Sequence, residues 1–178
     1  MAHNRPDHPT DGAQHPRKRS TMTAMGAEAR LSQLGLQLPP VSKPKGLYRP
    51  LVVVGPLAYT SGHLPVREDG SVVTGRVGAD LDQQAGYAAA RQTGLAILAT
   101  LRAELGSLDR VRRVVKIVGV VQCTDDFHNQ PAVVNGCSEL LAEVFGPEAG
   151  VGARTALGSS ALPLGAAVEI EAAFEIAP

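Results

Sequence analysis

Residues 111–123, VRRVVKIVGVVQC, decide the fold of this chain. Valine and isoleucine form a nearly continuous run in this segment, and such runs are typical of a β-strand that is covered on both faces. We therefore expect residues 111–123 to be the central strand of a sheet.

A helical pattern lies on each side of this strand. The alanine-rich residues 81–105 follow Asp80, a good N-cap, and end at Gly106, while Pro131 and Gly146 fit the first turn and the end of a second helix over residues 130–145. Apolar residues recur at helical spacing in the first helix and should face the sheet; they are Leu98, Leu101 and Leu105, together with Gly94.

Shorter β-strand patterns complete the chain. Residues 51–54 and 57–60 are apolar runs separated by Gly55 and Pro56, which predicts two strands joined by a tight turn. Whether a third short strand forms near residue 72 is left undecided by the sequence. Residues 153–159 and 166–176 supply the last two strands. This order predicts an α+β domain with a mixed β-sheet and two helices packed on one face. Self-association would cover the other face.

The N-terminal residues differ in composition from the rest. Residues 1–25 contain little apolar surface and hold three of the five histidines and several prolines, so we expect a disordered tail before a folded domain over residues 26–178. The irregular spacing of the tail histidines argues against a metal site. Cys123 and Cys137 lack metal-ligand spacing and are interpreted as structural thiols. We expect no metal and no cofactor.

The charge balance narrows the range of partners. Seventeen basic and 17 acidic residues give a net charge of zero, which argues against nucleic acid as a partner. No apolar run reaches the roughly 20 residues that span a bilayer, and residues 1–25 lack the apolar core of a secretory signal. We therefore expect a cytoplasmic protein without a membrane segment.

Arg154 stands alone in the C-terminal part of the chain. It is the only Arg or Lys after Lys116, and Glu169 and Glu171 follow it in the last predicted strand. A guanidinium in this setting is either a structural partner of these carboxylates or a bidentate clamp for the carboxylate of a ligand. Glu169, in turn, is either a general base or a solvent-facing strand residue.

Three motifs occur in order along the chain. They are GLYRPLVVVGPLAYTSGHLPV at residues 46–66, VVQCTDDFHNQPAVVNG at residues 120–136, and GARTALGSSALPLGAAVEIEA at residues 152–172. Together they resemble the RidA (YjgF) family of imine and enamine deaminases, whose members are also called L-PSP endoribonucleases. The strongest element is the last one, in which LP follows Arg154 by eight and nine residues and precedes an acidic VEIE strand.

The resemblance implies a chorismate mutase-like fold, with the sheets of a homotrimer forming a central barrel and the sites lying between subunits. It also implies that Arg154 holds the carboxylate of a 2-imino or 2-enamino acid and that Glu169 activates the hydrolytic water. Other positions that match the family's pocket are Tyr48, Ser61, Gly62, Asn135 and Ala156. This chain has Ala156 in place of the family's Cys and reads SGH, with His63, in place of SGQ.

These observations lead to a cofactor-free hydrolytic deaminase as the first hypothesis, with a small-molecule carboxylate as substrate. The alternative is a non-catalytic trimer that holds a carboxylate metabolite or a partner in the same cleft. RNA cleavage ranks last, because RNA recognition uses stacking aromatics and basic grooves, and the aromatic content is 3%.

Overall fold

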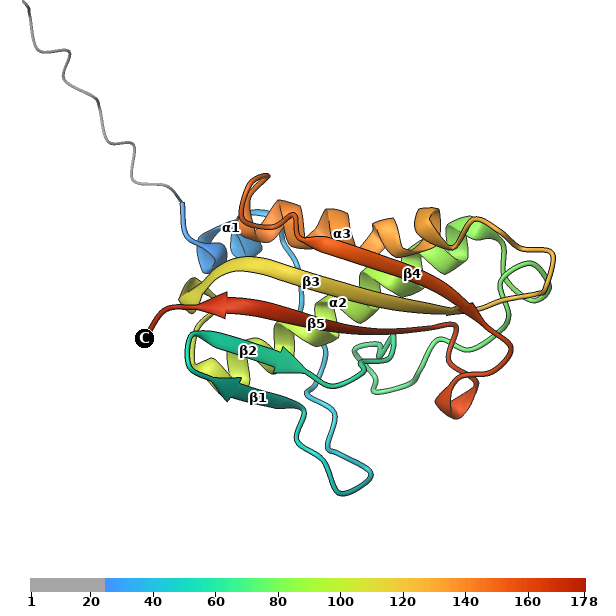
Figure 1. Cartoon of the computed structure of the whole chain (residues 1–178), viewed down its shortest axis with the longest axis horizontal. Helices are drawn as coiled ribbons and strands as arrows, with labels where there is room; N and C mark the ends of the chain where they lie inside the picture. The colour runs from blue at the N-terminus through green and yellow to red at the C-terminus, as the bar shows by residue number, and fades with distance from the viewer. Residues whose placement is uncertain (1–24) are drawn as a thin grey trace, which may run out of the picture.

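A mixed five-stranded sheet with two long helices on one face forms the domain (Figure 1). The computed structural model describes residues 25–178, so the predicted tail, apart from Met25, lies outside the described residues together with its three histidines. The elements are α1 (Ala27–Gln33), β1 (Leu51–Val54), β2 (Leu57–Thr60), α2 (Gln83–Leu105), β3 (Val111–Gln122), α3 (Gln130–Phe145), β4 (Ala153–Ser159) and β5 (Val168–Ile176), with short 3-10 turns at Leu108–Arg110 and Pro163–Gly165. This architecture confirms the predicted α+β class.

The strand order is β1-β2-β5-β3-β4, so β5 occupies the centre of the sheet. The prediction that residues 111–123 form the central strand is therefore wrong by one place. β5 pairs antiparallel with β2 and with β3, whereas β4 pairs parallel with β3 after the α3 crossover. Two antiparallel pairings place the C-terminal strand between the N-terminal hairpin and β3.

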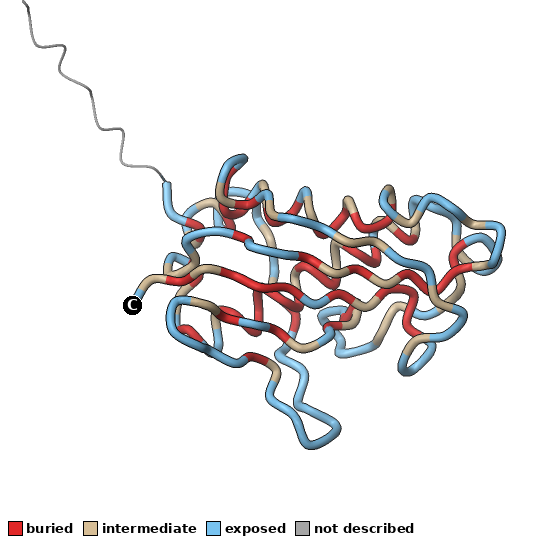
Figure 2. Tube along the Cα trace, viewed as in Figure 1, coloured by how far each residue is buried: buried red, intermediate tan, exposed pale blue. Residues whose placement is uncertain are grey.

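β3 is covered on one face only within a single chain. Val114, Ile117 and Val121 point into the core and are at most 2% exposed, whereas Val115 is 38% exposed. Figure 2 shows exposed residues, in pale blue, on the strands of the sheet. Large exposed hydrophobic residues on the strands are Val52, Val53, Val54, Tyr59, Val115 and Leu157.

The long helices pack closely because glycines lie where they meet. A Cβ on Gly136 of α3 would come within 2.1 Å of the Tyr87 carbonyl oxygen of α2.

α2 begins two residues later than predicted, since the Asp82 carboxylate accepts the Ala85 N–H at 2.7 Å and so caps the helix. Asp80 instead accepts the Arg76 N–H at 2.9 Å in the preceding turn.

No regular strand forms around Val72. Val66 and Val72 make one isolated bridge, and Thr74 makes another with Ala166. Ala166 therefore lies outside β5, which begins at Val168 and not at residue 166 as predicted. The segment between β2 and α2 therefore remains a long loop along the end of the sheet, where it supplies one wall of the site described next.

Candidate functional site

Arg154 is held by an amide and a hydroxyl from α3. Its Nη1 donates to Asn135 Oδ1 at 2.7 Å and to Ser138 Oγ at 3.1 Å. Asn135 and Ser138 are three residues apart and so lie on one side of the helix. Among residues 25–178, no carboxylate forms an ion pair with Arg154, and the residue is exposed. Neutral groups thus fix the guanidinium without neutralising its positive charge, which stays available to a ligand.

Glu169 lies on the opposite face of the sheet from Arg154. Arg154 is in register with Ile117, whereas Glu169 is in register with Val120, three residues further along the same strand. Side chains alternate between faces, so an odd separation places them on opposite sides. Glu171 is in register with Val118 and shares the face of Glu169. The expectation that Arg154 faces Glu169 and Glu171 does not hold within one chain.

Glu169 packs against Gly62, the middle residue of the SGH motif. A Cβ added at Gly62 would come within 2.0 Å of Glu169 Oε1. The loop is fixed to β5, because His63 and Ile170 exchange backbone hydrogen bonds at 2.8 and 3.0 Å. Burial raises the pKa of the Glu169 carboxyl, and the neighbouring charge of Glu171 raises it further. A carboxyl with a raised pKa holds a proton more readily than one in water.

His63 is buried as a neutral imidazole. Its Nδ1 lies 2.7 Å from the Ser61 carbonyl oxygen, which only accepts, so Nδ1 carries the proton. Nε2 then accepts the Thr100 hydroxyl, whose oxygen lies 2.8 Å away. Burial lowers the pKa of His63, and the bond to Ser61 opposes this effect. The ring therefore fixes the SGH loop to α2 instead of carrying a charge.

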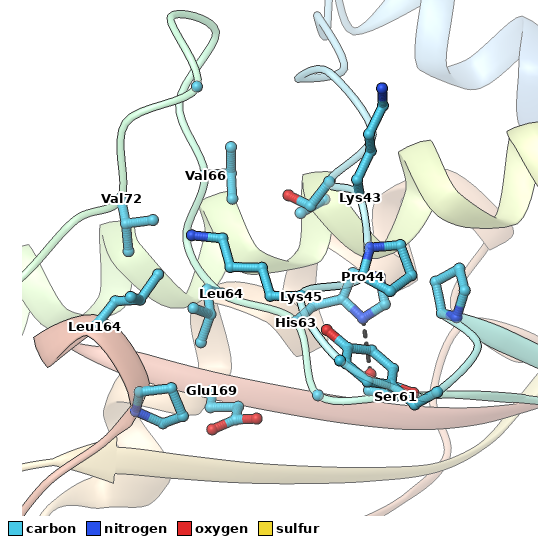
Figure 3. Close-up of a pocket in the computed structure, with 18 residues that line it drawn as sticks. Lys43, Pro44, Lys45, Ser61, His63, Leu64, Val66, Val72, Leu164 and Glu169 are labelled. Carbon is cyan, nitrogen blue, oxygen red and sulfur yellow. Dashed lines mark hydrogen bonds between the residues drawn. The ribbon is translucent and has the colours of Figure 1, made fainter.

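A cavity of about 670 Å³ opens over this loop. Tyr48, Ser61, Gly62 and Glu169 line it, as Figure 3 shows for the labelled residues. Arg154, Asn135 and Ala156 do not line it. The candidate residues thus form two groups: the cavity group around Glu169, and the Arg154 group with Asn135 on α3 and Ala156 two positions along β4.

Sequence reasoning missed several contributors to these two groups. Ser138 has a signal in the sequence, since it follows Asn135 at helical spacing. Thr100, the partner of His63, carries none, because only the packing of α2 brings it to the loop. Lys43 and Lys45, which line the cavity, belong to a loop with no regular pattern.

The cysteines show the chemistry of structural thiols. Cys123 and Cys137 are buried and free, and burial raises the pKa of Cys137 to about 12 despite the nearby Arg154 charge. Residues 25–178 contain no group of three His, Cys, Asp or Glu side chains arranged to hold a metal ion. Over the same residues, no helix combines the length and apolarity that crossing a membrane requires.

Known proteins share this sequence and fold. Residues 28–174 match the family described as "YjgF/chorismate_mutase-like, putative endoribonuclease". Protein TCP17 of Trypanosoma cruzi is 43% identical over 148 residues, which is 83% of this chain and 92% of that protein.

Two solved structures place the chain within that group. Protein Atu1372 of Agrobacterium tumefaciens, of unknown function, is 42% identical with a TM-score of 0.77, over 85% of this chain and 94% of that one. RidA from the Antarctic bacterium Psychrobacter sp. PAMC 21119 is 27% identical with a TM-score of 0.55, over 76% and 94%. The chain therefore belongs to the YjgF (RidA) family and has its chorismate mutase-like fold, in a branch that lies nearer to the Agrobacterium protein than to RidA.

Proposed function

We propose that this protein is a cofactor-free hydrolase that converts reactive 2-imino or 2-enamino acids into 2-keto acids and ammonia. The reaction takes place in the cytoplasm, in clefts between the subunits of a homotrimer. Family membership supports a role on small molecules. The cavity beside Glu169 supports it further, since pockets of about 300–1,000 Å³ are typical of small-molecule sites.

The positions of Arg154 and Glu169 carry the proposal. The two residues lie on opposite faces, two strand positions apart and three residues along the sheet, so their backbones are separated by roughly 14 Å. One small substrate cannot contact both side chains in one chain. Arg154 of one copy must therefore face Glu169 of another copy, which makes the exposed sheet surface part of the assembly.

Each group has a defined task in this arrangement. Arg154, fixed by Asn135 and Ser138, binds the substrate carboxylate through parallel N–H donors. Ala156 contributes its backbone beside it. On the other copy, Tyr48 and Ser61 offer hydroxyl groups, and Gly62 leaves space for the Glu169 carboxylate.

Glu169 then acts as the general base. Water adds to C2 of the protonated imine as one of its protons moves to the Glu169 carboxylate and the C=N electrons move to nitrogen. The carboxylic acid returns that proton to nitrogen. The C–N bond breaks, ammonia leaves, and the hydroxyl proton is released as the keto group forms. The raised pKa of Glu169 suits a group that both takes and returns a proton.

Mixing two inactive variants tests the proposal. Arg154→Ala and Glu169→Gln should each abolish ammonia release from freshly generated iminopropanoate. When the two proteins are unfolded and refolded together at equal amounts, half of the arginine groups and half of the glutamate groups are intact. About a quarter of the sites then combine both, so about a quarter of the wild-type rate should return.

The outcomes separate the alternatives. A site within one chain would give no activity after mixing, whatever the ratio. A wild-type protein that binds keto acids, with the thermal stabilisation that binding brings, but accelerates no imine hydrolysis would be the non-catalytic carboxylate-binding trimer. RNA cleavage would require stacking surfaces, yet among residues 25–178 only Tyr48 and the buried His63 bring an aromatic ring to the cavity lining.

A further inference from the structure

The cavity beside Glu169 extends well past the place where a reacting carbon would lie. Ser61, Gly62 and Glu169 line its polar end at the sheet. Its volume of about 670 Å³ is far more than the imine of a small amino acid such as alanine would fill. The remaining space is large enough for a long substrate side chain.

The walls of that remaining space are apolar. They come from the loop between β2 and α2, from the turn before β5, and from α2 itself. Such walls favour methylene groups, because moving a CH₂ group from water into apolar surroundings is favourable. The apolar wall residues are Leu64, Val66, Val72, Ala96, Pro163 and Leu164.

A cationic side chain lies beside this apolar region. In Figure 3, the Lys45 side chain runs across the cavity above Leu64, with its ammonium end on the side of Val72 and Leu164. Lys43, from the same loop, also lines the cavity, but its ammonium end points away from it in Figure 3. Among residues 25–178, neither lysine forms an ion pair. Within this described part of the chain, Glu169 is the only carboxylate that lines the cavity.

We propose that this cavity selects 2-imino acids whose side chain is a methylene chain ending in a carboxylate, with Lys45 binding that terminal carboxylate. The assignment rests on the proposed function, because it takes Glu169 as the position of the reacting carbon. The methylene chain contacts the apolar walls, and the distal anion reaches the Lys45 ammonium beside them. A neutral side chain of the same length would leave Lys45 without a partner.

A pair of keto acids of equal length tests this without requiring turnover. Binding of 2-oxoadipate and 2-oxohexanoate, which differ only in a terminal carboxylate against a terminal methyl, is measured by calorimetry on the full chain. Wild-type protein should bind 2-oxoadipate about tenfold more tightly. Lys45→Ala should bring this ratio close to one, and Lys45→Arg should keep most of it. Lys43→Ala removes the same charge from the same loop and should change the ratio less than about twofold.

The same pair of side chains is then compared in catalysis, with imines generated from 2-aminoadipate and norleucine by an amino acid oxidase. A preference for the dicarboxylic imine that disappears in Lys45→Ala supports the assignment. Equal binding of the two keto acids by wild-type protein, or equal loss in the Lys45 and Lys43 variants, would overturn it. Lys45-dependent binding of 2-oxoadipate without any imine hydrolysis would keep this inference and reject the deaminase.

Discussion

Gly62 lies directly against the Glu169 carboxylate, because a Cβ at position 62 would lie 2.0 Å from Oε1 and would force the carboxylate to move. We therefore predict that Gly62→Ala displaces Glu169, abolishes deamination and lowers the free energy of unfolding by about 1–3 kcal/mol. Denaturant unfolding and ammonia release measure the two effects.

The double variant identifies the cause of that loss. If the clash is with the carboxylate, Gly62→Ala should cost much less stability in a Glu169→Ala background, since the obstructing group is gone. The two substitutions would then be strongly non-additive. An equal cost in both backgrounds would mean that Ala at position 62 is strained for another reason.

The pH dependence of activity should report the environment of Glu169. Its pKa lies above the ordinary value of 4.5 because of burial and the Glu171 charge, and the base must be ionised to accept a proton. The acid limb of kcat/KM should therefore lie above pH 4.5. Glu171→Gln should move it to lower pH, whereas Glu175→Gln, a matched charge removal further along β5, should move it little.

The raised pKa of Glu169 also makes the free energy of unfolding depend on pH. Between its ordinary pKa and the raised folded value, the folded state binds more protons than the unfolded state, so stability falls as pH rises through that window. Glu169→Gln removes this penalty and should raise the melting temperature at pH 7 more than at about pH 4. A larger gain at low pH would contradict a raised pKa.

Local signals account for much of what the sequence predicted. The bounds of β1, β2, α3 and β4 follow from residues that end regular structure, such as Gly55 in the turn after β1, at φ +58°, and Gly146 after the last residue of α3. The order of strands depends on pairings between distant segments, which no local pattern contains. The same holds for the faces of Arg154 and Glu169, because a slip of one residue in the register of β3 with β4 would move Arg154 to the other side.

The hydrogen bonds from Asn135 and Ser138 should matter for substrate binding more than for folding. Asn135→Ala and Ser138→Ala each free the exposed Arg154 guanidinium to adopt other rotamers, so KM for the imine should rise by about three- to tenfold. The double variant should approach the defect of Arg154→Lys, which keeps the charge without the bidentate geometry. Steady-state kinetics and melting temperatures separate the effects, and a melting temperature lowered in step with activity would indicate misfolding instead.

Thr100 should be required to satisfy the buried face of His63. Thr100→Val removes the hydroxyl that donates to Nε2 and leaves a buried acceptor unpaired, at a cost of about 1–3 kcal/mol. Thr93→Val is the matched control, since the buried Thr93 hydroxyl donates only to the Ala89 carbonyl of its own helix, and it should cost below about 1 kcal/mol. Comparable losses in both variants would contradict a specific role for the bond to His63.

The neutral state of His63 also has a consequence for stability. Because burial lowers its pKa below 6.5, the unfolded chain binds more protons between the folded pKa and pH 6.5. Stability should thus decline as pH falls through that window, and His63→Gln should flatten this decline. Unfolding curves across the window measure it, and nitrogen NMR shifts should show Nδ1 protonated throughout and Nε2 gaining its proton only as pH falls through the folded pKa. Since the ring fixes the loop that carries Gly62, its protonation should weaken both the fold and the support of Glu169.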